Sequence, residues 1–400
     1  MSQRARKEYI REVSARYALA GRTEKSRILD EFCQTGGYNR KYAVGLLRRP
    51  GATVCGPIKR PRAQVYGRQE REALAQLWKL SDCLCSKRLV PFLPELIVAL
   101  ERHGELCLCA DVRAKLLTIS ASTADRLLAA ERNVRPLRGL TTTKPGTLLR
   151  QQIQVRTQFG WDEQKPGYFE TDLVAHCAES MAGDFLYTLT FTDIATGWTE
   201  CQGLANRSQI LVTAAIDRIR KMLPFPVLGI DCDNGTEFIN HVLKGYCDKH
   251  KIELTRCRPY RKNDQCYVEQ KNWSIVRHYM GYARYEGAQE CSHLQSAYRW
   301  LRRYVNFFQP SLKLLAKDRD PDNPAKVRKR YDEAKTPYQR LLVSDALDEP
   351  ARQDLATFYA DLNPAQVRED LHTCIRRLDQ ARIARLKLRS ATQLPEAPQA

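Results

Sequence analysis

The sequence predicts a multidomain protein in which α-helical units flank a central α/β domain built on a mixed sheet. Apolar residues recur at helical spacing up to about residue 133 and again beyond about residue 290. Between these limits, short segments run apolar or alternate apolar with polar residues, which is typical of strands. A chain of 400 residues is long enough to bury several such cores. We therefore expect N-terminal all-α units, an α/β core and an α-helical C-terminal region.

The charge of the chain indicates a polyanionic partner. The formal net charge is +19 and the sequence pI is about 9.4. Such an excess is typical of nucleic-acid-binding proteins, although a solvated basic surface is the alternative. No run of about 18 apolar residues is present, and no apolar signal segment follows the basic N-terminus. We expect a cytoplasmic protein whose partner is DNA and not a membrane.

Fourteen cysteines are scattered along the chain. In a large intracellular protein, such cysteines are usually reduced and buried as small hydrophobic residues. Two CxC pairs, Cys83/Cys85 and Cys107/Cys109, could bind zinc. Zinc sites more often use CxxC spacing, and both pairs lie in apolar stretches, so a structural role is the stronger expectation.

Residues 1–62 have the pattern of a helix-turn-helix unit. A helix over Glu24–Cys33 ends at a pair of glycines, and an asparagine is placed to cap a second helix over Arg40–Arg48. A second helix that starts with two cations after a glycine turn is typical of DNA-binding units of this kind. Arg40 and Lys41 are therefore candidate DNA contacts. An ordinary α-hairpin is the alternative.

Residues 63–133 give a second signal of the same kind. Ser120 is placed to cap a helix over Ala121–Arg132, which we interpret as a second recognition helix. An ordinary capped helix is the alternative. The side chains of base- or phosphate-contacting type on this helix are Ser122, Thr123 and Arg126. From 134 to 165, prolines, glycines and basic residues predict an extended linker.

Residues 166–290 predict the element order βββαβαβα. Turn residues bound the segments, which carry many aromatic and threonine side chains. The expected strands are Tyr168–Ala175, Phe185–Asp193, Trp198–Leu204, Val227–Cys232 and Ile252–Arg256. The expected helices begin after Ser208, cover Ile239–His250 and span about Asp264–Ala283.

Three acids in this region have the placement of a metal site. Asp172 falls on the first strand, Asp233 at the end of the fourth, and Glu269 on the last helix, with 35 residues between the last two. Carboxylates from separate elements can converge on two divalent ions, which activate a nucleophile against a phosphodiester. Because all the donors are oxygens, we expect two Mg²⁺ or Mn²⁺ ions. Three unrelated surface acids are the alternative.

The surroundings of these acids resemble the DDE catalytic triad of transposases and retroviral integrases. The resemblance covers Phe169 to Asn272 and rests on the segments Asp233-Asn234-Gly235-Thr236-Glu237-Phe238 and Tyr267-Val268-Glu269-Gln270-Lys271-Asn272. It implies an RNase H-like fold in which Asp172 and Asp233 bridge both ions and Glu269 holds one. It also implies cleavage of transposon ends to leave a 3′-OH, attack of that hydroxyl on target DNA, and a dimer or larger assembly that holds two ends.

Outside the core the resemblance is looser. The helical N-terminal units and the segment Lys329–Tyr338 look like a bacterial insertion-sequence transposase. No histidine precedes His103, so the N-terminal zinc domain of retroviral integrases is absent. Residues 291–400 are expected to be helical with a disordered tail, in place of the integrase β-barrel. The cations expected to hold DNA phosphates near the Glu269 helix, with a solvated basic face as the alternative, are Lys262, Lys271 and Arg277.

The function expected from these patterns is that of a DDE transposase acting at the bacterial nucleoid. One alternative is a DNA-binding regulator with an inactive nuclease-like core, and the intact acids argue against it. Another is an RNase H-like nuclease acting on RNA, which would leave two helix-turn-helix units without a role.

Overall fold

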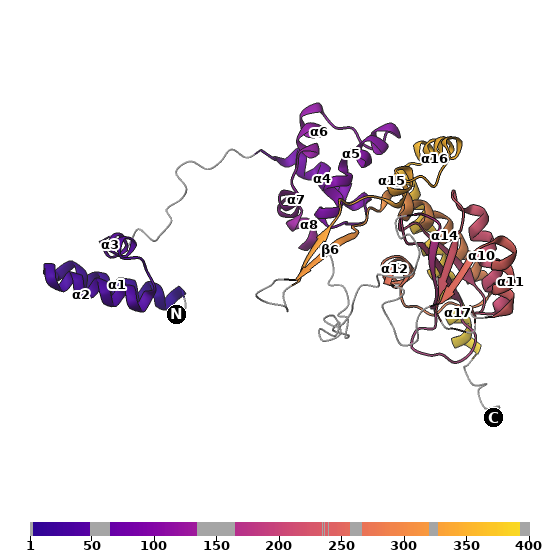
Figure 1. Cartoon of the computed structure of the whole chain (residues 1–400), viewed down its shortest axis with the longest axis horizontal. Coiled ribbons are helices and arrows are strands. Elements are labelled where there is room, and N and C mark those ends of the chain that lie inside the picture. Colours follow the sequence, from indigo (N-terminus) through magenta and orange to yellow (C-terminus); the bar gives the residue numbers. More distant parts are fainter. Residues whose placement is uncertain are drawn as a thin grey trace, which may run out of the picture. The chain divides into compact units, whose positions relative to one another are not determined.

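The computed structural model describes residues 3–48, 65–133, 165–256 apart from 234, 236 and 239, 266–319 and 327–392. The chain forms two compact units, Met1–Val65 and Tyr66–Ala400, and Figure 1 labels many of their elements. The linker expected at 134–165 lies outside the described residues except for residue 165. The three domains expected at 63–133, 166–290 and 291–400 fall within the second unit.

The first unit is a bundle of three helices around an aromatic core. Its helices are α1 (Gln3–Leu19), α2 (Arg22–Gly36) and α3 (Arg40–Arg48). Phe32 is fully buried, and its ring stacks on Tyr9 and Tyr38 with centroids 5.5 and 5.2 Å away. Gly37 ends α2 at φ 67°, a left-handed conformation in which a larger residue would be strained. The predicted helix over Arg40–Arg48 is confirmed.

The second unit begins with five more helices. They are α4 (Arg68–Leu80), α5 (Ser86–Arg102), α6 (Ala110–Leu117), α7 (Ala121–Leu127) and α8 (Ala129–Asn133). Ser120 caps α7 as predicted, because its hydroxyl accepts the Thr123 N–H at 3.2 Å. The predicted single helix over Ala121–Arg132 is wrong, since the chain leaves α7 at Leu128. Leu128 is 1% exposed, so its burial in the core coincides with the break.

A five-stranded mixed sheet forms the centre of the second unit. Its strands are β1 (Tyr168–Ala175), β2 (Tyr187–Asp193), β3 (Thr199–Leu204), β4 (Gly229–Cys232) and β5 (Glu253–Arg256). They lie in the order β3-β2-β1-β4-β5, with β1 antiparallel to β2 and parallel to β4. The predicted order βββαβαβα is confirmed, although four of the strands begin one or two residues later than expected.

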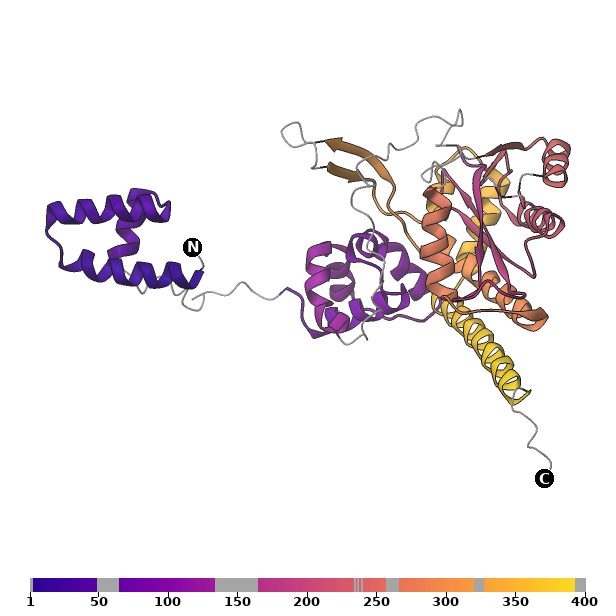
Figure 2. The same ribbon diagram turned by 90° about the horizontal axis from the view of Figure 1, so that it is seen from below.

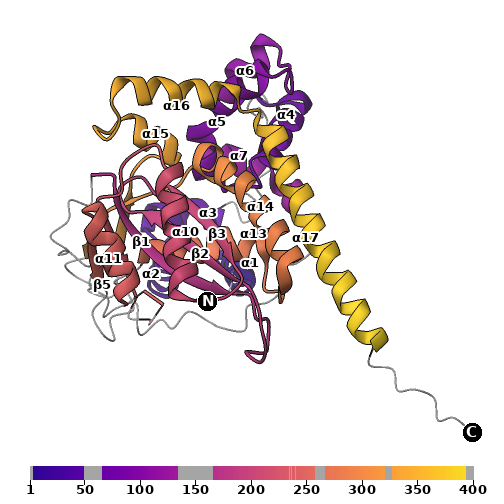
Figure 3. The same ribbon diagram turned by 90° about the vertical axis from the view of Figure 1, so that its right-hand side faces the viewer.

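Helices cover both faces of this sheet, as Figure 3 shows. Helices α10 (Gln209–Met222) and α11 (His241–His250) lie on one face, and α12 (Cys266–Lys271) and α14 (Gly287–Phe308) lie on the other. Phe169 of β1 stacks on Phe191 of β2 with ring centroids 4.3 Å apart. Because successive strand residues point to opposite faces, Glu170 and Asp172 share the face away from Phe169. That face is the one toward α12.

The helical segment that carries Glu269 is not uniform. Helix α12 continues into a π-helical segment, η1 (Asn272–Arg277), and then into α13 (His278–Met280). The expected end at Ala283 is wrong by three residues, because Gly281 takes a positive φ of 69° after the last turn. Wide π turns inside helices are frequent at functional sites, and this one begins three residues after Glu269.

The C-terminal region combines helices with a small hairpin. Its remaining helices are α15 (Pro337–Leu342), α16 (Glu349–Asp361) and α17 (Pro364–Thr392). The expectation of an all-helical region is wrong between them and α14, where β6 (Leu314–Arg319) pairs antiparallel with β7 (Val327–Tyr331). Every residue of β7 is exposed, so no alternation of buried and exposed positions marks it as a strand. Helix α17, yellow in Figure 2, packs along α14.

Two further expectations concern membranes and cysteines. Among the described residues, no helix is both long and apolar enough to cross a bilayer. The described cysteines are free thiols, and three of them are exposed, which corrects the expectation of burial at Cys85, Cys107 and Cys109. Within the described part of the chain, neither CxC pair belongs to a cluster of three metal-ligating side chains.

Candidate active site

The sheet brings two of the predicted acids to one edge. Strands β1 and β4 are parallel neighbours, with Glu170 opposite Asp231 and Thr171 opposite Cys232. Asp172 and Asp233 are the next residues after these pairs, so they lie side by side where the pairing of β1 with β4 ends. Each lies two residues beyond a buried acid, Glu170 or Asp231, and shares its face of the sheet.

Asp172 is held by two hydrogen bonds in a mostly buried position. Its Oδ1 accepts the backbone N–H of Leu173 at 2.8 Å, and its Oδ2 accepts the side-chain amide of Asn272 at 2.6 Å. Burial raises the pKa of Asp172 to about 6, and the negative charges of Asp233 and Glu269 add to the rise. The two hydrogen bonds favour the ionised form and limit the rise. The three acids thus lie within electrostatic reach of one another.

Asp233 stands at the start of a tight turn. Its Oδ1 accepts the N–H of Gly235 at 2.9 Å. A Cβ at Gly235 would lie 2.7 Å from the Glu237 carboxyl and 2.9 Å from Asp233 Oδ1, so a larger residue would force these carboxylates to move. Burial raises the pKa of Asp233, and the nearby charge of Glu237 raises it further. Glu237 is thus a fourth acid at this edge, and its motif alone did not predict this role.

Glu269 lies in the first turn of α12 and its side chain is exposed. The start of this helix is joined to β1 by Glu170, whose Oε2 accepts the backbone N–H groups of Tyr267 and Val268, both at 2.9 Å. Asn272, one turn after Glu269, is the donor to Asp172. The sequence analysis assigned no role to Glu170 or Asn272, although one precedes Asp172 by two residues and the other follows Glu269 by three.

The donor set fits hard divalent cations. Asp172, Asp233 and Glu269 offer only oxygens, the ligand type that Mg²⁺ and Mn²⁺ prefer. Asn272 Oδ1 is buried beside Asp172 and has no hydrogen-bond partner, so an acceptor oxygen is left for a cation or its water. In the described residues, no three acidic, histidine or cysteine side chains are close enough to share one ion. The acids are therefore gathered at one edge but do not form a closed ligand sphere.

The basic residues predicted around α12 have different surroundings. Lys271 points toward the β2–β3 turn, where its Nζ lies 3.6 Å from the position of a Cβ on Gly197. Arg277 donates to the carbonyl of Ala175 at 2.9 Å and stacks over the Tyr282 ring, so it packs against the end of β1. Lys262 lies outside the described residues.

The predicted DNA contacts in the helical regions also make local bonds. Arg40 donates to Asp30 and to Ser26 of α2, and Lys41 is exposed beside it. In α7, Arg126 donates to Thr123 Oγ1 at 3.0 Å and to the carbonyl of Ser122 at 3.3 Å. These bonds are on the surface, where a polyanion can replace them.

Two buried polar groups beside the acids are structural. Asp231 is fully buried and accepts the Thr255 hydroxyl of β5 at 2.7 Å. His176 is fully buried, and its Nε2 bonds to Thr188 Oγ1 at 2.7 Å. Burial lowers the pKa of His176 to about 3, with Arg277 adding to the effect, so the ring is neutral at physiological pH.

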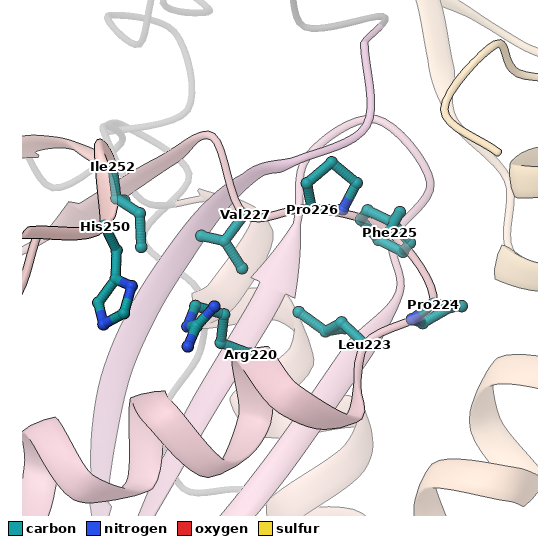
Figure 4. A pocket seen from close by; sticks show the side chains of 8 residues that line it. All are labelled: Arg220, Leu223, Pro224, Phe225, Pro226, Val227, His250 and Ile252. Atoms are coloured by element: carbon teal, nitrogen blue, oxygen red, sulfur yellow. The ribbon is translucent and has the colours of Figure 1, made fainter. Parts of the chain in front are cut away.

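A cavity at the other end of β4 is separate from the acids. It has a volume of about 360 Å³ and is lined by Arg220, the loop from Leu223 to Val227, His250 and Ile252, as Figure 4 shows. These residues precede or surround the starts of β4 and β5, whereas Asp233 follows the end of β4. The cavity therefore plays no part in the acidic edge.

Comparisons with known proteins agree with the sheet order. Residues 162–262 match the protein family described as Integrase core domain, a range that includes Asp172 and Asp233 but stops before Glu269. The uncharacterized protein y4rM of Sinorhizobium fredii is 45% identical over 342 residues, which cover 85% of this chain and 96% of that protein.

Solved structures of viral integrases are more distant. The catalytic core domain of BIV integrase is 18% identical, with a TM-score of 0.27. The match covers 35% of this chain and 83% of the BIV integrase chain. The HTLV-2 integrase catalytic core domain in complex with magnesium, in its dimeric form, is 15% identical, with a TM-score of 0.29. The match covers 38% of this chain and 93% of the HTLV-2 integrase chain. At such scores neither likeness adds to the family match. The second unit nevertheless contains an RNase H-like integrase core, by family and by sheet order.

Proposed function

The chain belongs to the same family as the Sinorhizobium fredii protein y4rM, and from its integrase core we propose that it is a metal-dependent DNA transposase. Its reaction would be cleavage at transposon ends followed by strand transfer into target DNA. The proposal is supported by the side-by-side positions of Asp172 and Asp233 on adjacent parallel strands. Burial is the main cause of the raised pKa of Asp172, and the charges of Asp233 and Glu269 add to it.

Each acid would have a distinct part in the reaction. Asp172 and Asp233, on adjacent parallel strands, would hold the metal ions together with Glu269 of α12. Bound there, Mg²⁺ or Mn²⁺ would supply Lewis-acid activation of a water or a 3′-hydroxyl. Asn272 keeps one oxygen of Asp172 in a fixed orientation through its 2.6 Å hydrogen bond.

The DNA-binding part of the proposal rests on the helical regions. Helix α3 presents Arg40 and Lys41 at its start, and α7 presents Ser122, Thr123 and Arg126. We assign both helices to recognition of the transposon ends, in helix-turn-helix units of the kind that insert a helix into the major groove. Lys262, Lys271 and Arg277 would act on the DNA backbone near the acids. Because two ends must be held together, the active form would be a dimer or larger assembly.

A DNA-binding regulator with an inactive core is the competing function. It would need the DNA-binding helices but not the three acids. Their joint placement favours the enzyme, since clustered carboxylates cost folding free energy and a regulator would gain nothing from them.

The test is a strand-transfer assay beside a gel shift on end DNA, in Mg²⁺ or Mn²⁺. We expect Asp172→Asn, Asp233→Asn and Glu269→Gln each to reduce cleavage and joining by at least about 100-fold, the scale of losing one group that acts in the transition state. Binding to end DNA should stay within about twofold. Asp248→Asn, an exposed acid on α11, is the matched control. Robust joining by any triad variant, or in excess chelator, would refute the proposal.

A further inference from the structure

We propose that Glu170 is a positioning residue that fixes Glu269 relative to Asp172. This inference rests on the proposed function, because it assigns the spacing of the metal-holding acids to one buried side chain. Glu170 lies on β1 two residues before Asp172 and is 1% exposed. Because its carboxylate is buried against the start of α12, it would act through that helix and not by contacting DNA.

The hydrogen bonds of Glu170 join the strand to the start of the catalytic helix. Its Oε2 accepts the N–H groups of Tyr267 and Val268, both at 2.9 Å. These are the second and third residues of α12, where backbone N–H groups have no partner within the helix. A carboxylate at this end also interacts favourably with the helix dipole. Glu170 thus provides α12 with a capping acceptor from another element of the fold.

A second bond repeats the connection one turn later. Asn272 donates to Asp172 at 2.6 Å, so β1 contacts the helical segment at two levels. Glu269 lies between these levels, after Val268 and before Asn272. The path from the Asp172 carboxylate to the Glu269 backbone therefore runs only through a rigid strand, buried hydrogen bonds and one helical turn. A change at Glu170 would be transmitted to Glu269 without altering any acid at the edge.

The hydrogen-bond geometry of this position favours a glutamate. A buried carboxylate is costly unless several donors satisfy it, and two backbone N–H groups on one oxygen provide that compensation. Glutamine would keep the length but offer a neutral, weaker acceptor. Aspartate would keep the charge but is one methylene shorter, so the start of α12 would have to move toward β1. Both substitutions therefore alter the position of Glu269 by different physical routes.

The test measures Mn²⁺ binding directly, by the loss of the free-ion EPR signal, in the full-length protein. We expect Glu170→Gln and Glu170→Asp to weaken Mn²⁺ binding by about 10–100-fold, the usual effect of losing a residue that orients ligands. The Mn²⁺ concentration at half-maximal cleavage should rise by the same factor, while gel shifts on end DNA stay unchanged. Circular dichroism melts establish that each variant is folded.

Asp193→Asn is the matched control. Asp193 is fully buried on the same sheet and also accepts two backbone N–H groups, from Gly167 at 2.8 Å and Thr196 at 2.7 Å. Neither group belongs to α12, so this variant should lose stability without losing Mn²⁺ affinity. If Glu170→Gln fails to fold, Tyr267→Pro removes one of the two donors in the first turn of α12, where the lost N–H makes no bond within the helix. It should reproduce the weaker Mn²⁺ binding.

Three outcomes are distinguishable. Wild-type Mn²⁺ binding by the folded Glu170 variants, or an equal loss in Asp193→Asn, would overturn the positioning role. Weaker Mn²⁺ binding only in the variants that alter the Glu170–α12 bonds would support it. If the wild-type protein binds Mn²⁺ through the three acids but joins no DNA, the proposed function fails while the positioning role stands.

Discussion

The two helical regions of the molecule share one sequence pattern but differ in how they are built into it. Residues 3–48 close a core of their own around Phe32 and form a separate compact unit. Residues 66–133 belong to the unit that contains the integrase core, and their helices share its hydrophobic core. A helix-turn-helix pattern therefore identifies a local shape, and it does not reveal whether that shape is an independent module.

The second region is joined to the rest of its unit by bonds from the end of α4 and the loop after it. Asp82 accepts a hydrogen bond from His278 Nε2 of α13 at 2.9 Å and pairs with Arg368 of α17 at 3.9 Å. The carbonyl of Leu80 accepts the Tyr304 hydroxyl of α14 at 2.8 Å. Three separate elements thus contact one short stretch of chain.

The largest expected effect on folding comes from deleting the N-terminal helical regions. A chain starting at Tyr66 should stay folded and keep its melting transition, because the first unit has its own core. A chain starting at residue 134 should fail to fold, since it exposes the apolar surfaces that α4 and α5 cover. Size-exclusion chromatography and thermal melts of the two fragments measure this difference. Equal behaviour of the two fragments would remove the distinction between the regions.

Replacing one acid in each helical region should have a smaller effect on stability. Asp82→Ala should lower the free energy of unfolding by about 2 kcal/mol, because it leaves His278 and Arg368 without their partly buried anion. Asp30→Ala in the first unit should cost less than about 1 kcal/mol, since its ion pair with Arg40 is exposed. Urea unfolding curves of both variants provide the comparison. Asp82→Asn, which tolerates the positive φ of 56° at this position, separates loss of charge from backbone strain.

The stabilisation that Asp82 gives through His278 and Arg368 is expected to depend on pH. Burial acts to raise the pKa of Asp82, but His278, Tyr279 and Arg368 together bring it below its usual value. A lowered folded-state pKa stabilises the protein above the unfolded value near 3.8, and this stability is lost as pH falls through the folded-state pKa. The difference between wild type and Asp82→Asn should therefore shrink in acid, and a constant difference down to pH 2 would contradict the pairing.

The acidic edge is expected to give an effect of the opposite sign on the free energy of unfolding. Because the pKa of Asp172 is raised to about 6, its charge destabilises the metal-free fold above that pH, and the cost disappears as pH falls below about 3.8. Asp172→Asn should thus raise the free energy of unfolding at pH 7.5 in chelator by about 1–2 kcal/mol, a figure reduced for partial solvent exposure. Urea curves at pH 7.5 and pH 4 check both the gain and its loss. A destabilised variant at pH 7.5 would mean that neither burial nor the neighbouring charges make the ionised form of Asp172 costly.

The sequence was informative where the role of a residue depends only on the helix or strand to which it belongs. The order of elements along the chain followed from local patterns, which also placed Asp172 on β1, Asp233 after β4 and Glu269 on α12. The hairpin of β6 and β7 could not be found, because its exposed, largely cationic second strand pairs through the backbone and leaves no apolar period.

Roles that depend on distant partners were also out of reach. Glu170 accepts hydrogen bonds from residues nearly 100 positions away in the sequence, and Asp82 contacts His278, which lies 196 positions away. Nothing in the neighbouring residues marks either acid as a link between elements. Arg40, predicted only as a DNA contact, also joins α2 to α3 through Asp30 and Ser26. Local patterns identify which side chains are available, and tertiary packing decides which of them meet.

The most direct test of the central claim is a change of metal preference at one acid. Asp233→Cys replaces a hard oxygen ligand by a soft thiolate, which tolerates Mn²⁺ better than Mg²⁺. We predict that strand transfer by this variant falls at least about 100-fold in Mg²⁺ and recovers in part in Mn²⁺, whereas Asp233→Ala recovers in neither. A ratio of Mn²⁺ to Mg²⁺ activity that is the same for wild type, Asp233→Cys and Asp233→Ala would contradict the assignment of Asp233 as a metal ligand.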